Sequence, residues 1–171
     1  RAVLEREPIL SERLVVVSAA ELPDPFARGG ATCGADTETA AGPPLSLEQL
    51  AAVPQVSFPE NYDLRVAMDA AFGAAGITPA VAVEGAEMDA ALRFSERGIG
   101  VAVVPAMVAV NRPALRATPF AAPVADELTR TISIARRSDM APTHAAAALQ
   151  VLVREVADRL ASLDHGLVSR V

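Results

Sequence analysis

The chain has 171 residues, of which 51% are hydrophobic, 21% are charged and none is Trp, a balance typical of a globular α/β protein. The net charge is −6 and every fixed positive side chain is an arginine, so the chain lacks the basic face that DNA-backbone binding needs. The single cysteine, Cys33, excludes an internal disulfide. The longest apolar run, residues 99–110, is broken by Gly100 and Pro105 and is too short to cross a bilayer. Because residues 1–10 are charged throughout and show no secretory signal, we expect a cytoplasmic protein without membrane contact.

The first predicted elements enclose a long connection. Residues 14–17 form a β-branched run that predicts a buried strand. Residues 19–44 are rich in glycine, proline and small polar residues and predict a surface loop. A capping box from Ser46 to Gln49 then indicates a short helix that ends near Val53.

The middle of the chain alternates between strand and helix patterns with tight connections. The predicted elements are a strand over residues 55–58, a helix over 61–75, a strand over 80–83, a helix over 87–97 and a strand over 99–104. Such alternation predicts parallel strands joined by right-handed helical crossovers.

The last part of the chain holds one more predicted strand and a long helix. Residues 111–129 are irregular and contain prolines, residues 131–136 predict a strand, and residues 143–163 predict a helix. The apolar side of this helix carries Ala147, Val151, Leu152, Val156 and Leu160. A stable domain avoids exposing such a side, so we expect it to need a partner that this chain does not supply.

Residues with catalytic chemistry are few. His144 and His165 have no neighbouring serine or cysteine in a nucleophile motif, and Cys33 has no partner at zinc-ligand spacing. The Gly98-Ile99-Gly100 sequence leads into a strand instead of opening a helix, so it fails the dinucleotide-binding pattern. We therefore predict no catalytic residue, no metal site and no cofactor.

An acidic cluster follows the strand predicted over residues 80–83. Glu84, Glu87 and Asp89 lie at a strand end and a helix start, where the helix dipole favours carboxylates, so we interpret them mainly as capping residues. General acid–base catalysis would require one of these carboxyls to have its pKa shifted by burial.

Residues 58–65 are the most suggestive segment. They leave the carboxyl end of a strand and enter a helix, which is where open α/β sheets bind ligands. Free backbone N–H groups at that helix start can hold a carboxylate or phosphate, and Tyr62, the only tyrosine, offers a flat ring and a hydroxyl. A small-molecule pocket and a simple helix start, with Asn61 as the cap and Tyr62 packed nearby, both remain open.

Four blocks, in this order, resemble the second half of the effector domain of LysR-type transcription regulators. They are REPILSERLVVVS at residues 6–18, PLSLEQLA at 44–51, GAEMDAAL at 85–92 running on to GIGVAVVP at 98–105, and RTISIARR at 130–137. The helix followed by Gly-hydrophobic-Gly and an apolar strand closed by Pro105 is the most diagnostic piece. The sequence Tyr62-Asp63-Leu64-Arg65 adds weight, and the resemblance covers about residues 6–163.

The resemblance implies an α/β fold like that of type 2 periplasmic binding proteins, in which two lobes are joined by two crossing strands. Residues 1–13 would be the end of the first lobe, and residues 14–136 a complete second lobe with hinge strands at 14–18 and 131–136. Residues 137–171 would be a C-terminal helix that returns to the first lobe, followed by a tail. The DNA-binding head and most of the first lobe are missing, so we expect a longer native protein.

By position, the resemblance places a small effector, carboxylated or aromatic, in the cleft between the lobes. This side of the cleft would be lined by Ser57, Phe58, Pro59, Asn61, Tyr62, Glu84, Gly85 and Ile132. The chain would then be a non-catalytic, ligand-sensing domain. DNA would be bound by an N-terminal winged helix-turn-helix that is not present here.

The family also implies a homodimer or homotetramer, with the strand over residues 80–83 and the helix over 87–97 as candidate dimer surface. One alternative is a solute-binding protein of a transport system with the same fold, which a signal peptide upstream would distinguish. A second alternative, an enzyme, would have to use the polar groups near the cleft, namely Tyr62, Glu60, Asp63 and Glu84.

Overall fold

The computed structural model describes residues 3–27, 43–109, 112–163 and 166–171. Cys33, His165 and most of the loop predicted over residues 19–44 lie outside these ranges. The chain divides into two compact units, which are described separately. The central unit is Leu14–Leu128, and the terminal unit combines Arg1–Arg13 with Thr129–Val171.

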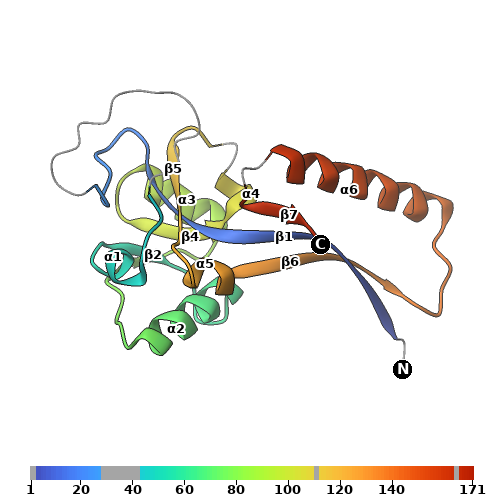
Figure 1. Ribbon diagram of the computed structural model, residues 1–171, viewed down its shortest axis with the longest axis horizontal. Coiled ribbons are helices and arrows are strands. Elements are labelled where there is room, and N and C mark those ends of the chain that lie inside the picture. Colours follow the sequence, from blue (N-terminus) through green and yellow to red (C-terminus); the bar gives the residue numbers. More distant parts are fainter. Residues whose placement is uncertain (1–2, 28–42, 110–111, 164–165) are drawn as a thin grey trace. The chain divides into compact units, whose positions relative to one another are not determined.

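The elements are labelled in Figure 1. In chain order they are β1 (Leu4–Ala19), α1 (Leu47–Ala51), β2 (Gln55–Ser57), α2 (Asp63–Ala75), β3 (Val81–Glu84), α3 (Met88–Glu96), β4 (Val101–Pro105), α4 (Ala106–Ala109), β5 (Leu115–Pro119), α5 (Val124–Glu127), β6 (Thr129–Arg137), α6 (His144–Leu163) and β7 (Val168–Arg170). No helix in the described ranges is long and apolar enough to span a membrane.

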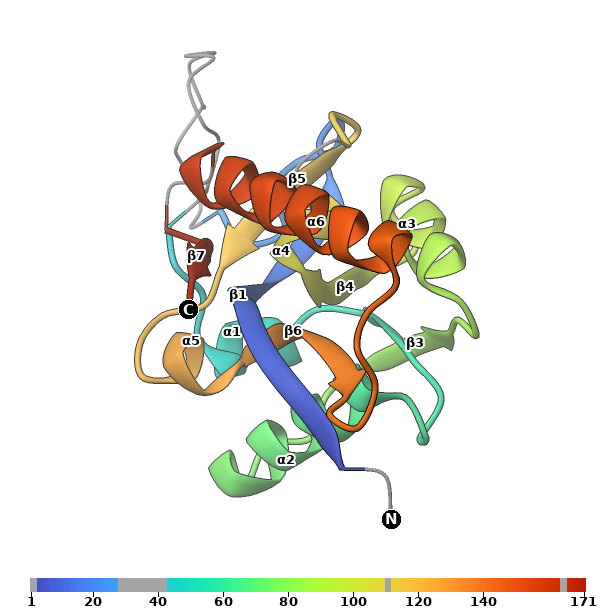
Figure 2. The same cartoon turned by 90° about the vertical axis from the view of Figure 1, so that its right-hand side faces the viewer.

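The sheet of the central unit has the strand order β3-β2-β4-β1-β5. β2 runs parallel to β3 and β4, which confirms the parallel arrangement predicted from the alternating pattern, whereas β1 is antiparallel to β4 and β5. The chain moves from β2 outward to β3 and then back past β2 to β4. These opposite movements place α2 and α3 on opposite faces of the sheet, as Figures 1 and 2 both show.

The core of the central unit is centred on the second half of β1 and on β4. Val15, Val16, Val17 and Val104 have no exposed surface. Each such burial contributes about 1.5–3 kcal/mol before conformational entropy is counted. The strand predicted at residues 14–17 is thus the most buried part of β1.

Two predicted helix boundaries are present in the structure. The Ser46 hydroxyl accepts a hydrogen bond from the Gln49 amide at 3.3 Å, and the Gln49 side chain accepts one from the Ser46 amide at 3.0 Å, which confirms the capping box. α2 ends at Gly76, whose φ of 69° is the left-handed conformation that glycine adopts readily.

Other boundaries were predicted wrongly. β1 is 16 residues long, because its first half, in which only Ile9 and Leu10 are buried apolar residues, becomes a strand by pairing with β6. Residues 111–129 were expected to be irregular, but β5 forms there by pairing with β1, where Thr118 is opposite Val16, and α5 follows. β7 was also missed. Asn61 is not the cap of α2, since the N-cap is Tyr62 and its side chain makes no capping hydrogen bond.

In the terminal unit, the first half of β1 lies between β6 and β7, and α6 packs against β7. Residues 131–136, which the resemblance assigns to the second lobe as a hinge strand, lie within β6 and group with this unit. On α6, Ala157 is buried. The apolar side chains Leu149, Val151, Leu152 and Val156 are exposed.

Candidate functional site

The predicted effector residues of the central unit meet where β2 and β3 end. Ser57 and Glu84 are the last residues of these strands and are paired in register. The Gly85 amide donates a hydrogen bond to the Ser57 carbonyl at 2.9 Å. Because β2 and β3 are parallel, α2 and α3 both begin at this edge, which we call the β2–β3 edge (Ser57, Phe58, Tyr62, Glu84 and Gly85).

The turn from β2 into α2 is organised by two aromatic rings. The rings of Phe58 and Tyr62 stack with centroids 4.7 Å apart and planes 13° from parallel. The Tyr62 amide donates to the Pro59 carbonyl at 2.9 Å, which closes the turn between them. Phe58 is only 3% exposed, so it supports the half-buried Tyr62 ring from beneath.

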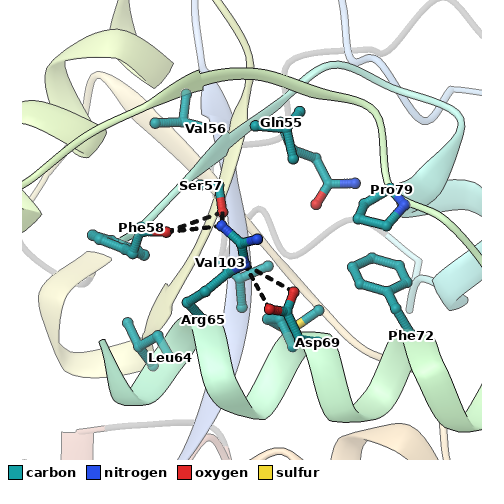
Figure 3. Close-up of a pocket in the computed structure, with 12 residues that line it drawn as sticks. Gln55, Val56, Ser57, Phe58, Leu64, Arg65, Asp69, Phe72, Pro79 and Val103 are labelled. Carbon is teal, nitrogen blue, oxygen red and sulfur yellow. Dashed lines mark hydrogen bonds and ion pairs between the residues drawn. The ribbon is translucent and has the colours of Figure 1, made fainter. Parts of the chain in front are cut away.

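Arg65 connects α2 to the end of β2, as Figure 3 shows. Its Nη1 donates to the Ser57 hydroxyl oxygen and to the Phe58 carbonyl, both at 3.1 Å. Its Nε lies 2.7 and 2.8 Å from the two carboxylate oxygens of Asp69, and Nη1 is 3.7 Å from Glu84. Arg65 was not among the residues predicted for the site. The spacing of four residues between Arg65 and Asp69 predicts their ion pair on a helix. The contact between Arg65 and Ser57 could not be predicted in this way, because it depends on how α2 packs against β2.

The cavity in Figure 3 lies between α2 and the sheet. Its lining includes Gln55, Phe72 and Pro79 beside Arg65, and its volume is about 30 Å³. That space holds about one water molecule and no metabolite. The β2–β3 edge of the central unit therefore does not enclose a ligand by itself.

The remaining predicted residues have different positions. Asn61 is exposed. Ile132 belongs to the terminal unit, where it pairs in register with Leu10 of β1. Glu87 is the N-cap residue of α3, which is the position predicted for it. Its side chain makes no capping hydrogen bond. Asp89 forms an ion pair with Arg112 at 2.6 Å.

The groups at this edge suit binding more than catalysis. The side chain of the N-cap residue Tyr62 makes no capping hydrogen bond, so among the described residues the first-turn amides of α2 are left to donate to a ligand. Tyr62 adds a ring face, and the Glu84 carboxylate, about half exposed, adds a hydrogen-bond acceptor. His144 is exposed at the start of α6. Within the described residues, no group of three or more His, Cys, Asp or Glu side chains could hold a metal ion.

The fold and the site define one lobe of an α/β ligand-binding domain of the type 2 periplasmic-binding-protein class. The sequence model of the LysR substrate binding domain matches residues 2–158. The chain belongs to this family. No match was found among curated proteins.

Solved structures with the same fold include regulators of this type. The effector binding domain of QuiR in complex with shikimate is 17% identical, with a TM-score of 0.62 over 91% of this chain and 66% of that one. The Synechocystis PCC6803 CcmR regulatory domain in complex with 2-PG is 17% identical, with a TM-score of 0.64 over 92% and 68%. Full-length CbnR complexed with its target DNA is 19% identical, with a TM-score of 0.61 over 90% and 48%. The chain thus spans about two thirds of the isolated effector domains and about half of the full-length regulator.

Proposed function

We propose that this chain is the ligand-sensing, non-catalytic part of a LysR-type transcription regulator, and that it acts in the cytoplasm. The observation that carries the proposal is the family match over residues 2–158. The ligand would be a small carboxylated or aromatic effector. Two solved relatives of this fold are described in complex with small molecules, shikimate and 2-PG.

The β2–β3 edge would supply one wall of the effector site. The first-turn amides of α2 would hold a carboxylate, and the Tyr62 ring would pack against the flat part of the ligand. Arg65 is already bound to Asp69, so a free guanidinium is not the carboxylate receptor on this wall. Glu84 would favour a ligand hydroxyl beside it and disfavour a second negative charge.

The complete site would take further residues from outside this wall. Pro59 and Asn61 complete the turn before α2, and Ile132 on β6 stays a predicted effector residue. In this interpretation residues 1–13 end the first lobe, residues 14–136 form the second lobe and residues 137–171 return to the first lobe. The exposed Leu149, Leu152 and Val156 on α6 support this, because they are the kind of surface that the rest of a lobe covers.

The regulator carrying this chain would bind DNA through an N-terminal winged helix-turn-helix and would form a homodimer or homotetramer. β3 is an edge strand of the sheet, and Val81 on it is exposed. An exposed edge strand is a ready surface for pairing, which supports β3 and α3 as the dimer surface. Light scattering of the intact regulator should give a dimer or tetramer, and a monomer would contradict this assignment.

A solute-binding protein of a transport system is the second candidate, since it would use the same lobe architecture. A signal peptide upstream of this chain would support transport, and a helix-turn-helix would support regulation. Determining the upstream coding sequence therefore separates the two functions.

Effector binding can be tested with a probe that the chain already contains. Tyr62 is the only tyrosine of these 171 residues and there is no tryptophan among them, so the part of the intact regulator's emission change that is lost in Tyr62→Phe reports on the β2–β3 edge. Shikimate and benzoate should be titrated into the intact regulator, and binding should be measured by Tyr62 emission and by thermal unfolding. We expect a binder to change the emission and, at about 100 times its Kd, to stabilise the fold by about 2.7 kcal/mol. If no carboxylated or aromatic compound in such a panel does either, the proposed ligand class is wrong.

A further inference from the structure

The central unit has a second hollow at the edge of its sheet opposite the β2–β3 edge. It is lined by residues that lead into β2 and β4 and by the segment that follows β1. Because β2 and β4 are parallel, their starts lie side by side, at the other end of the strands from Ser57. We call this hollow the strand-start cleft (Leu22, Pro23, Pro54, Gly98, Ile99 and Gly100).

Two glycines bring the walls of this cleft close together. Gly98 has a φ of 71°, a left-handed conformation that residues with a side chain rarely adopt, and a Cβ there would collide with Cδ1 of Leu22. A Cβ at Gly100 would lie 2.8 Å from the backbone oxygen of Pro54. The Leu22 side chain therefore packs directly on the backbone that leads into β4, and the start of β2 packs beside it.

Arg116 of β5 holds the segment that follows β1 in place. Its Nη1 donates to the Ala19 carbonyl at 3.3 Å, and its Nη2 donates to the carbonyls of Ala20 at 3.2 Å and Leu22 at 3.4 Å. One guanidinium thus binds three backbone oxygens of this wall. The wall is formed without a ligand, and these oxygens already have a donor.

Few polar groups around the cleft are left for a ligand. Pro23, Pro25 and Pro54 have no backbone N–H group. The amides of Gly98 and Ile99 donate to carbonyls of α3 at 3.0 and 3.1 Å. Among the described residues that line the cleft, none is charged. The cleft therefore presents mainly hydrocarbon surface.

We propose that the strand-start cleft is a second ligand site, which binds an uncharged apolar molecule the size of a single aromatic ring. Its volume is about 170 Å³, and an apolar cavity of about 150 Å³ is large enough to bind benzene. Leu22 and Ile99 are each 47% exposed, so a ligand between them would remove apolar surface from water.

The chemistry of this cleft differs from that of the β2–β3 edge. A carboxylate entering the cleft would lose its hydration without gaining a charged partner, so an aromatic acid is rejected where an uncharged ring is accepted. The site goes beyond the proposed effector function and does not depend on it.

The affinity of the cleft can be measured with fluorobenzene, whose ¹⁹F signal is followed by NMR as the intact regulator is added. Ile99→Asp should weaken binding about ten-fold or more, because it places a carboxylate beside the ring. Ile99→Leu keeps an apolar side chain and should bind nearly as well as the parent. Val66→Asp makes the same change at an exposed apolar residue of α2, outside the cleft, and should leave the affinity unchanged. Equal affinities of Ile99→Asp and the parent, or an equal loss in Val66→Asp, would overturn the proposal.

A second measurement locates the probe in the unmutated regulator, where the folding of a variant plays no part. Fluorobenzene should shift the ¹³C-methyl NMR signals of Leu22 and Ile99 through its ring current, and leave unchanged that of Ile77, which follows the C-cap of α2. Benzoate at the same concentration should leave the two cleft methyls unchanged. Cleft methyls that do not respond to fluorobenzene, or that respond equally to benzoate, would contradict the proposal.

Discussion

The ring of Phe58 lies beneath that of Tyr62, with centroids 4.7 Å apart and planes 13° from parallel. This stack holds the start of α2, a role for which most helices use a capping side chain. The first-turn amides of α2 consequently keep their capacity to donate to a ligand. An aromatic contact at the end of β2 thus links the local turn to the proposed function of the β2–β3 edge.

Removing the buried Phe58 ring should lower the stability of the fold, whereas removing the Tyr62 hydroxyl should not. We expect Phe58→Ala to lower the free energy of unfolding by about 3–5 kcal/mol, because it removes a large buried side chain and leaves a cavity. Tyr62→Phe keeps the ring and should change stability by less than about 0.5 kcal/mol. Urea denaturation followed by circular dichroism measures both. A loss below about 1 kcal/mol for Phe58→Ala would show that its ring does not support the turn.

Arg65 should contribute more through its bonds to the β2 end than through its ion pair. Asp69 is half exposed, so Asp69→Asn should cost less than about 1 kcal/mol. Arg65→Gln also removes the donors to the Ser57 hydroxyl and the Phe58 carbonyl, and should cost about 1–2 kcal/mol. Denaturant unfolding of the two variants side by side makes the comparison. Equal losses of stability in the two variants would mean that the hydrogen bonds from Arg65 to the end of β2 contribute nothing.

Two glycines should respond to alanine with opposite signs. A Cβ at Gly100 would lie 2.8 Å from the backbone oxygen of Pro54, so Gly100→Ala should destabilise by about 1–3 kcal/mol. A Cβ at Gly73, on α2, meets nothing within 4 Å, and Gly73→Ala should stabilise by about 0.5–1 kcal/mol through higher helix propensity. Thermal unfolding of both variants tests the packing at the start of β4. Stabilisation by Gly100→Ala would contradict it.

The contact between α6 and β1 should weaken in acid. The hydrogen bonds from Arg154 hold the pKa of Glu7 below its ordinary value of 4.5. Because the folded pKa is the lower one, the stabilisation is fully present above about pH 4.5 and is lost as the pH falls through the folded pKa. The Arg154 Nε–H signal in NMR should move toward that of a free guanidinium over this range. In Glu7→Gln the signal should show no such transition, and a transition that persists there would assign it to another group.

The alternating middle of the fold could be predicted from sequence, whereas the strands that depend on pairing could not. β2, α2, β3, α3 and β4 each carry their own hydrophobic period, and their parallel arrangement follows from the order. β5 has no such signal, since Leu115–Pro119 lies between prolines and is a strand only because β1 runs beside it. The first half of β1 was missed for the same reason, because it is a strand by pairing with β6.

For the site, sequence could place residues at strand ends but could not show which of them touch. Ser57 and Glu84 were expected at neighbouring ends and are register partners. The burial of Phe58 beneath Tyr62 and the bridge from Arg65 to Ser57 depend on how the turn folds back, which no local pattern encodes. The burial of Glu12 was equally invisible, because Ser11 and Arg13 on either side are polar.

Mapping a bound ligand on the backbone measures whether the chain senses an effector at the β2–β3 edge. Amide signals of the ¹⁵N-labelled intact regulator should be followed by NMR while a ligand found by thermal shift is added. We expect the amides of Asp63, Leu64 and Gly85 to shift together, with the same apparent Kd as the emission change that is lost in Tyr62→Phe. A ligand that stabilises the protein while these amides and the Tyr62 emission stay unchanged would contradict effector binding at the β2–β3 edge.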